Sequence, residues 1–244
     1  MKVYKLINKV FQYLGMEIKR FPNIQVRRRM SLLKHFDINL VLDIGANKGQ
    51  YGSDLLKFGY SGKIISFEPL STAYKDLSNT SMKTNNRWIS HNIAIGNEDG
   101  EIEINVANNS FSSSILPMLE KHIENAPGSD YIGKETVTIN KLDTLIPGFL
   151  TTIDRIFMKI DTQGYEKNVL EGIKNNIDKI IGIELEMSLT KLYESNFLFQ
   201  DVIDYMQSNG FTLYGIEEEF TAPKTGQLLQ ANGIFFRNEY NTNY

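Results

Sequence analysis

Two acidic residues stand at the ends of apolar runs in the first third of the chain. Asp43 lies near the end of the run 40–44, and Glu68 follows the run 63–67. The turn between Asp43 and the next helical pattern reads Gly45-Ala46-Asn47-Lys48-Gly49. In a parallel sheet the carboxyl ends of neighbouring strands meet at one crevice, where an acid at the tip of the second strand can accept both ribose hydroxyls. The pattern therefore predicts a nucleoside pocket with Glu68 holding the ribose.

The turn indicates which kind of cofactor fits this pocket. Gly45 and Gly49 have no Cβ, so a ligand can lie against the main chain. A dinucleotide-binding turn reads Gly-x-Gly-x-x-Gly and holds a pyrophosphate at a helix amino terminus, where a carboxylate would repel it. Here Asn47 occupies the middle glycine position and Asp43 precedes the turn. We therefore expect a cationic ligand without phosphate, such as the amino group and sulfonium of S-adenosyl-L-methionine. The alternative is an ordinary strand-turn-helix with a solvated aspartate.

Lys159 and Asp161 lie two residues apart at the end of a later apolar run, 153–161. On an extended strand both side chains leave the same face, so an ammonium and a carboxylate would meet there. A positioned proton acceptor typically contributes about 10² to 10⁴-fold to the reaction of a hydroxyl. We predict that Asp161 is the catalytic base or orients the acceptor, with Lys159 supporting it. The alternatives are a structural ion pair, or Asp161 as the cap of a helix starting near Tyr165.

Glu184 and Glu186 repeat the same-face spacing on the next predicted strand. They are expected either to line the acceptor side or to bind a divalent metal together with Asp161, since hard cations take oxygen ligands. Nothing in the sequence shows such a cluster, so we assign no metal site. The histidines lack metal-ligand spacing and are interpreted as structural or solvated, with only His122 placed to reach an acceptor: His35, His91 and His122.

The composition is that of a globular protein, with 244 residues, 41% hydrophobic and 23% charged. This length suffices for one domain with a full core, and no apolar run approaches the 18 residues that a membrane span requires. The absence of cysteine excludes disulfides, thiolate metal sites and cysteine nucleophiles. It also fits a cytoplasmic protein.

Residues 1–35 differ in charge from the rest, with nine Lys or Arg and one acid, whereas the remainder is acidic. Apolar residues at helical spacing predict an amphipathic helix over 2–15, so 1–35 is interpreted as a basic helical extension of a domain at 36–244. Such a helix suits an anionic membrane surface. Packing within the molecule or a homodimer contact is the alternative, with the arginines 27–29 solvated or paired with the acidic body. Nucleic acid is not expected as a partner, because that body opposes phosphate.

Beyond residue 38, short apolar runs alternate with helical patterns, which is typical of a parallel sheet covered by helices. We expect strands near 40–45, 63–68, 88–94, 154–160 and 179–186, with helices near 48–58, 71–79 and 165–177. A helix near 198–209 then precedes a closing antiparallel pair at 211–216 and 231–237. The alternating segments 101–106 and 135–139 predict a small β insertion at about 97–150.

Together these motifs resemble the FkbM-type methyltransferases, a class I S-adenosylmethionine-dependent family, over about residues 38–237. The resemblance is carried by Asp43-Ile44-Gly45-Ala46-Asn47-Lys48-Gly49, Phe67-Glu68-Pro69, Ala94-Ile95-Gly96 with Asp99-Gly100, and Lys159-Ile160-Asp161-Thr162-Gln163-Gly164-Tyr165-Glu166. It implies an α/β fold with a Rossmann-like seven-stranded sheet, mostly parallel with an antiparallel closing pair and helices on both faces. It also implies S-adenosyl-L-methionine as methyl donor.

The resemblance further implies roles for individual residues. The methionine side of the pocket would be shaped by Asp43, Gly45, Asn47 and Gly49. Glu68 would hold the ribose, and the segment from Asn92 to Ala94 would lie near the adenine. One departure is visible, because the family commonly has Glu where this chain has Gln163. If that carboxylate transfers protons elsewhere in the family, its role falls to another residue here, or the activity is weaker.

The predicted function is O-methylation of a hydroxyl on a sugar, glycan or related natural product, with a small-molecule or glycan acceptor. One alternative is a degenerate methyltransferase fold that binds ligand or partner without catalysis, for which Gln163 is the main argument. The other is an NAD-dependent Rossmann oxidoreductase, for which the third turn glycine and a phosphate-binding provision are missing. The serine-rich loop 110–114 supplies hydroxyls able to bind sugar, although serine clusters are usually turns.

Overall fold

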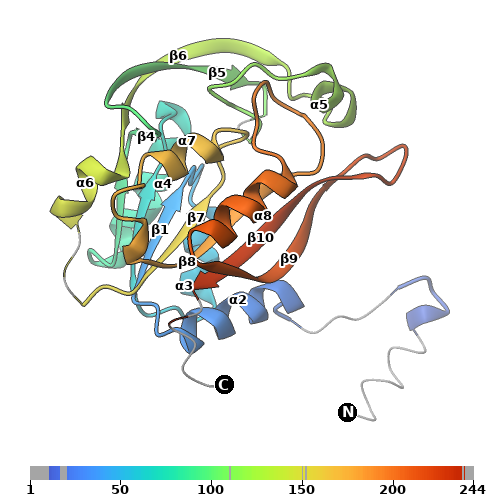
Figure 1. Ribbon diagram of the computed structural model, residues 1–244. Helices are drawn as coiled ribbons and strands as arrows, with labels where there is room; N and C mark the ends of the chain where they lie inside the picture. The colour runs from blue at the N-terminus through green and yellow to red at the C-terminus, as the bar shows by residue number, and fades with distance from the viewer. Residues whose placement is uncertain are drawn as a thin grey trace.

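The computed structural model describes residues 11–16, 21–109, 111–149, 151, 153–237 and 239. They form a central seven-stranded sheet, with a three-stranded sheet above one end of it (Figure 1). In spatial order the central strands are β3 (Trp88–His91), β2 (Lys63–Phe67), β1 (Leu40–Ile44), β7 (Ile156–Ile160), β8 (Ile180–Ser188), β10 (Leu228–Arg237) and β9 (Phe211–Thr221). The pairs β3–β2, β2–β1, β1–β7 and β7–β8 are parallel, whereas β10 runs antiparallel to both β8 and β9. The predicted α/β sheet with a closing antiparallel pair is therefore confirmed.

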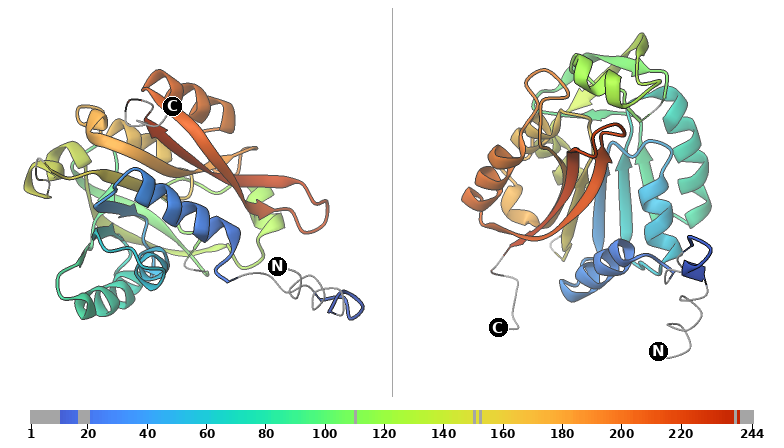
Figure 2. Two further views of the ribbon diagram at one scale, coloured as in Figure 1. Left: turned by 90° about the horizontal axis from the view of Figure 1, so that it is seen from below. Right: turned by 90° about the vertical axis from the view of Figure 1, so that its right-hand side faces the viewer.

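Helices lie on both faces of this sheet (Figure 2). Three of them, α2, α3 and α4, pack on one face, whereas α6, α7 and α8 pack on the other. The helices are α2 (Ile24–His35), α3 (Gln50–Lys57), α4 (Ser71–Ser81), α5 (Glu120–Asn125), α6 (Leu142–Phe149), α7 (Glu166–Glu171) and α8 (Phe199–Ser208), with 3-10 turns η1 (Met82–Thr84) and η2 (Ile177–Lys179).

The alternation of side chains along β1 shows how the two cores form. Leu42 and Ile44 join the cluster beneath α6, α7 and α8, whereas Val41 joins the cluster beneath α2, α3 and α4. Asp43 therefore leaves the same face as Val41. Register places Asp43 beside Lys159 of β7, and Lys159 beside Glu184 of β8. A buried row of charged side chains thus crosses this face near the carboxyl ends of the strands.

The strand order reverses between β1 and β7, because the chain first builds β2 and β3 on one side of β1 and later adds β7 on the other. In open α/β sheets, ligands bind at such a reversal, in the crevice outside the carboxyl ends of the strands. The smaller sheet lies above this end in Figure 1 and consists of β4 (Ala94–Ile95), β6 (Tyr131–Asn140) and β5 (Gly100–Ala107).

Two predicted elements are shorter in the structure. The strand predicted at 88–94 ends at His91, because the side-chain amide of Asn92 donates to the carbonyl oxygens of Glu68 and Pro69. Ala94 and Ile95 pair instead with β6. The helix predicted at 165–177 ends at Glu171, because the carbonyl oxygen of Gly172 accepts a hydrogen bond from the backbone of Asp143.

The amino-terminal part of the chain is described only from residue 11, so the helix predicted over 2–15 lies largely outside the described residues. Helix α2 follows at Ile24–His35, and its Leu33 packs in the same core cluster as Phe36 and Phe236. None of the helices in the described part of the chain combines the length and apolar character that a membrane span requires.

Candidate active site

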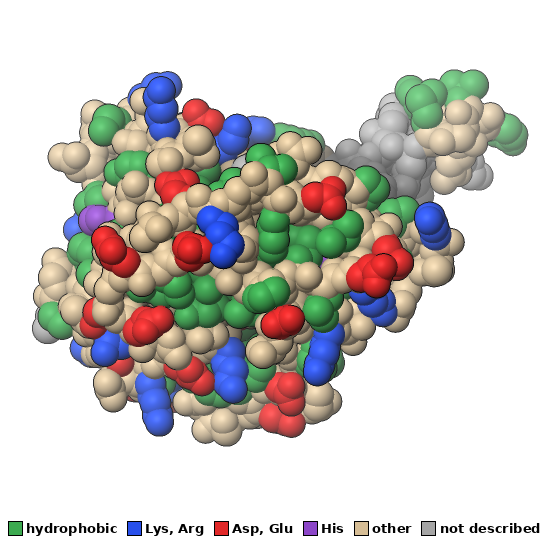
Figure 3. All heavy atoms as spheres, turned by 90° about the horizontal axis from the view of Figure 1, so that it is seen from above, with side chains coloured by type: hydrophobic (Ala, Val, Ile, Leu, Met, Phe, Trp, Pro, Cys, Tyr) green, Lys and Arg blue, Asp and Glu red, His purple; other side chains and the backbone are tan. Residues whose placement is uncertain are grey.

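A cleft of about 890 Å³, including open solvent at its mouth, lies at the carboxyl ends of β1, β2, β7 and β8. Residues of the β insertion complete the cleft, and the face that carries the insertion shows hydrophobic side chains between charged ones (Figure 3). The polar wall comes mainly from Asn47, Glu68, Asp161, Gln163, Glu186 and Glu219.

The turn after β1 has a shape that depends on glycine. Gly45 lies at φ 74° and Asn47 at φ 49°, both in the left-handed region. A Cβ on Gly45 would collide with the carbonyl oxygen of Asp161, so the end of β7 rests directly against this turn. Gly49, at φ 85°, does not line the cleft; a Cβ there would meet Trp88 and Leu77. Gly49 therefore allows α3 to pack closely, whereas Gly45 and Asn47 lie at the cleft.

Glu68 is held at the cleft by two backbone N–H groups. Its Oε2 accepts from Asn47 at 2.8 Å and its Oε1 accepts from Leu70 at 2.9 Å. A carboxylate has about four lone-pair sites, so two remain for ligand hydroxyls. Burial raises the pKa of Glu68 to about 7, although both backbone hydrogen bonds favour the ionised form. Glu68 is thus arranged to accept from two neighbouring hydroxyls.

The end of the cleft beyond Glu68 is apolar. Ile93, Ala94 and Ile95 line it together with Leu70. These aliphatic side chains suit the faces of a flat ring such as adenine. Asn92 is exposed and does not line the cleft; its two hydrogen bonds to the carbonyls after β2 shape the loop that carries Glu68.

Asp43 lies behind the cleft wall. It is fully buried, its Oδ2 accepts from the hydroxyl of Ser66 at 3.1 Å, and its Oδ1 is 3.6 Å from Nζ of Lys159. Burial raises the pKa of Asp43, and the ammonium of Lys159 opposes that shift. Asp43 therefore does not line the cleft itself, and its charge reaches the cleft only through its ion pair with Lys159.

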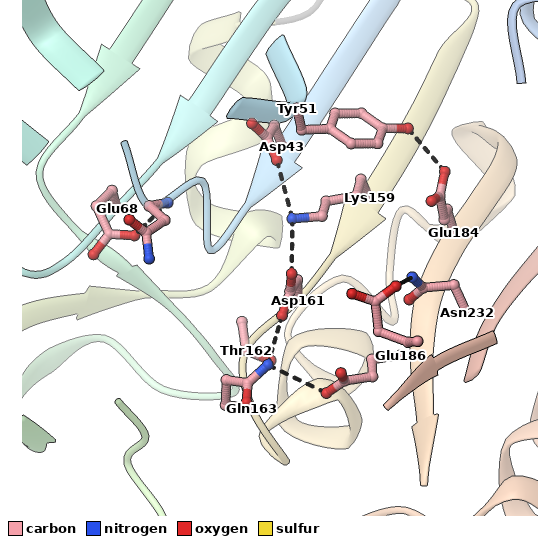
Figure 4. Close-up of polar contacts among 12 residues, drawn as sticks. Asp43, Tyr51, Glu68, Lys159, Asp161, Thr162, Gln163, Glu184, Glu186 and Asn232 are labelled. Carbon is pink, nitrogen blue, oxygen red and sulfur yellow. Dashed lines mark hydrogen bonds and ion pairs between the residues drawn. The ribbon is translucent and has the colours of Figure 1, made fainter. Parts of the chain in front are cut away.

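Lys159 bridges the buried Asp43 and the cleft residue Asp161 (Figure 4). Its Nζ lies 3.2 Å from Oδ2 of Asp161. Burial disfavours the ammonium, but the carboxylates of Asp161 and Asp43 outweigh this and raise the pKa of Lys159. Lys159 is therefore a fixed cation, and the Asp161 side chain, 41% exposed, carries the accessible charge of the pair.

Gln163 joins Asp161 to a second carboxylate on β8 (Figure 4). Its Nε2 donates to Oδ1 of Asp161 at 2.9 Å and to Oε2 of Glu186 at 3.3 Å, and its Oε1 accepts from the hydroxyl of Tyr193 at 2.9 Å. The amide thus separates two acids that would otherwise repel one another. The sequence singled out Gln163 only as a departure from the family pattern, because its partners come from distant parts of the chain.

Glu186 lines the cleft. The sequence predicted for it either a place on the acceptor side or a metal site. It is 7% exposed, and burial together with the neighbouring carboxylates of Asp161 and Glu166 raises its pKa well above the ordinary value. Glu166 itself accepts from the backbone N–H groups of Thr162 and Gly164. It therefore fixes the turn that presents Asp161 and Gln163.

Glu184 takes part in a different cluster from Glu186. Arg29 of α2 donates to both of its oxygens at 2.8 and 2.6 Å, Tyr51 donates to it at 2.8 Å, and Arg29 also reaches Glu217 at 3.0 Å. Arg29 is thus paired with the acidic body. Within the described ranges, no group of three or more His, Cys, Asp or Glu is arranged to hold a metal ion.

His122 does not line the cleft. Its ring is buried beside Tyr193 and Phe220, with centroids 5.1 and 5.5 Å away, and burial lowers its pKa to about 4. In the serine-rich loop, Ser114 lines the cleft and donates to the carbonyl oxygen of Gln163 at 2.7 Å. This hydroxyl therefore ties the insertion to the turn that follows β7.

A cleft at the strand-order reversal, with acidic side chains on both sides, is the place where Rossmann-like α/β proteins bind their ligands. The family model of the methyltransferase FkbM domain matches residues 43–213, so the chain belongs to the FkbM methyltransferase family. It is a methyltransferase that uses S-adenosyl-L-methionine.

Two known proteins show the extent of the similarity. The 2-O-methyltransferase NoeI of Sinorhizobium fredii (strain NBRC 101917 / NGR234) is 26% identical over 197 residues, which cover 78% of this chain and 80% of NoeI. The crystal structure of methyltransferase FkbM from Methylobacillus flagellatus KT matches with a TM-score of 0.50 and 16% identity. That match covers 82% of this chain and 44% of the other, and it shows the shared fold alone.

Proposed function

We propose that this methyltransferase methylates a hydroxyl of a sugar, glycan or related natural product. The observation that carries the proposal is the carboxylate of Asp161, which is held at the cleft by Lys159 and Gln163 opposite the half that contains Glu68. The similarity to NoeI, a 2-O-methyltransferase, supports oxygen as the acceptor atom.

The charges of the cleft fit S-adenosyl-L-methionine better than a dinucleotide. Among the described residues, its lining contains the acids Glu68, Asp161, Glu186 and Glu219 and no Lys, Arg or His. A pyrophosphate would find no cationic partner among these side chains. A sulfonium and an ammonium would instead meet carboxylates, which stabilise them.

When bound, the cofactor supplies a methyl group that is activated by the positive charge on its sulfur. Glu68 fixes the ribose, and Gly45 and Asn47 bring the main chain against the cofactor. Asp161 accepts the proton of the attacking hydroxyl, and Lys159 holds that carboxylate in one position. Positioning of the reacting atoms supplies a large share of the acceleration, and the proton acceptor contributes about 10² to 10⁴-fold more.

The proposal is tested in two steps. Calorimetry with S-adenosyl-L-methionine, S-adenosylhomocysteine and NAD is expected to show binding of the first two only. Labelled donor is then offered with a panel of sugars and glycolipids, and label is expected on an acceptor oxygen. Label on nitrogen or carbon, or binding of NAD alone, would contradict the proposal.

A further inference from the structure

The half of the cleft over β7, β8 and β9 lies away from Glu68. Glu68 directly follows β2, at the other side of the reversal point, and the apolar residues after it extend further in that direction. Neighbouring strands lie about 4.8 Å apart, so Glu186 on β8 stands three strand spacings from Glu68. The acceptor therefore meets the side chains of β7, β8 and β9.

A β-bulge places a further acid at this half. Along β10, Gln230 pairs with Phe220 and the next residue, Ala231, pairs with Glu218, so Glu219 is the extra residue of β9. Bulges beside active sites re-aim a side chain, and Glu219 lines the cleft. Asn232 of β10 lies beside Glu186 and donates to Oε2 of Glu219 at 2.9 Å. A residue of the neighbouring strand thus holds the Glu219 side chain toward the cleft.

The acids of this half have few positive partners. Lys159 does not line the cleft and lies against Asp161 and Asp43, and the amide of Gln163 donates to Asp161 and Glu186 without adding charge. Arg29, which contacts Glu184 of the buried row of charged side chains, is paired with Glu184 and Glu217. The acceptor half therefore carries a negative field.

The opposite wall of this half comes from the insertion. Phe111, a residue that is 63% exposed, lines the cleft together with Ser113 and Ser114. A site with an apolar or aromatic wall and a few placed polar groups suits a compact organic ligand. A hydroxylated ring can lie against Phe111 while its O–H groups donate to Glu186 and Glu219.

We propose that this half selects acceptors without negative charge near the reacting hydroxyl, and that Glu219 imposes the selection. Neutral sugars and amino sugars are accepted, whereas sugar phosphates and uronic acids are rejected. A negatively charged group would lie against the carboxylate of Glu219, whose hydrogen-bond partner Asn232 is neutral, and such an arrangement discriminates by repulsion. The proposal rests on the proposed function, because it names the substrate class of the same site.

The test uses matched pairs of methyl hexosides, each neutral sugar compared with its 6-phosphate and its uronate. Binding to the enzyme saturated with S-adenosylhomocysteine is measured by ligand-observed NMR, and turnover is measured with labelled donor. The neutral member is expected to bind at least tenfold more tightly than its charged partners. Equal or tighter binding of a phosphate or uronate would overturn the proposal, and so would failure of every sugar to bind.

Variants identify the residues responsible. Glu219→Gln is expected to reduce the preference for the neutral sugar at least threefold. Glu218→Gln removes the same charge from the adjacent, exposed residue, which does not line the cleft, and should leave the preference unchanged. An unchanged preference in Glu219→Gln would overturn the assignment. Failure of S-adenosylhomocysteine itself to bind would instead count against the proposed function.

Discussion

The two halves of the cleft are built in different ways. The cofactor half depends on one short stretch of chain, in which the turn after β1 and the carboxylate of Glu68 are joined through the backbone N–H of Asn47. The acceptor half depends on side chains from four strands and the insertion, linked through Gln163 and Asn232. The first half therefore depends on one side chain, Glu68, that backbone N–H groups hold in place, whereas the second depends on side chains that hold one another.

This difference predicts that substitutions in the two halves separate cofactor binding from turnover. Loss of a cofactor contact should lower affinity for both S-adenosyl-L-methionine and its product. Loss of an acceptor-half contact should leave that affinity intact and change the rate, its pH dependence or the choice of acceptor.

The largest effect is expected from Glu68→Ala. It removes a charged acceptor for two ligand hydroxyls, and each hydrogen bond to a charged group contributes about 1.5–3 kcal/mol. Affinity for S-adenosylhomocysteine should therefore fall by about 10² to 10⁴-fold in calorimetry. Glu101→Gln, at an exposed residue of β5, is the control and should bind normally. Unchanged affinity in Glu68→Ala would remove Glu68 from the ribose site.

The next largest effect is expected from Asp161→Asn. The substitution keeps the shape and the contact with Lys159 but removes the proton acceptor, so kcat should fall by about 10² to 10⁴-fold. Affinity for the cofactor should stay within about threefold. Asp178→Asn, at an exposed residue of η2, is the matched control. Full turnover in Asp161→Asn would assign the proton transfer to Glu186 or to solvent.

A smaller effect is expected from Gln163→Glu, which restores the residue common in the family. It replaces the bridging amide by a third carboxylate within 2.9 Å of Asp161 and 3.3 Å of Glu186. One of the three acids must then hold a proton, because like charges at this distance raise the pKa of their neighbours. The pH profile of kcat should shift upward, and the melting temperature should fall more at pH 8 than at pH 6.

Equal losses of melting temperature at pH 6 and pH 8 would argue against charge repulsion as the cause. Gln163→Met, which removes the hydrogen bonds without adding charge, separates the two effects. It should lower the rate with little upward shift of the pH profile.

The smallest effect concerns the stability of the ligand-free protein between pH 6.5 and 8. Burial raises the pKa of Glu68 and Glu166 to about 7, and burial with neighbouring carboxylates raises that of Glu186 well above its ordinary value. The folded state therefore binds more protons than the unfolded chain in this range, and the free energy of unfolding falls as pH rises. His91 and His122 have lowered pKa values and act in the opposite direction only below about 6.5.

Urea denaturation at pH 6.5 and pH 8 measures this slope. Glu186→Gln should flatten it and stabilise the protein at pH 8, since a neutral amide replaces a buried acid. A slope of the same size in the variant would show that Glu186 ionises without cost in the folded state.

The succession of strands and helices along the chain could be predicted, because each element has its own local pattern of apolar residues. Apolar runs that end in Asp43, Glu68 and Asp161 alternate with helical patterns, and the structure has strands at each of them. Element ends were predicted less well. The early end of β3 depends on a side chain of one loop bonding to another, and the early end of α7 depends on the backbone of α6. Such contacts have no signal in the local sequence.

The sequence by itself determined the turn at Gly45, the acid at Glu68 and the shared face of Lys159 and Asp161, because neighbouring residues on one strand or turn have fixed relative directions. Only the tertiary structure decided that Asp43 is buried behind Lys159, that Glu184 pairs with Arg29, and that Gln163 bridges two acids. These partners come from segments that approach one another only when non-consecutive strands pair and a bulge turns Glu219 toward the cleft.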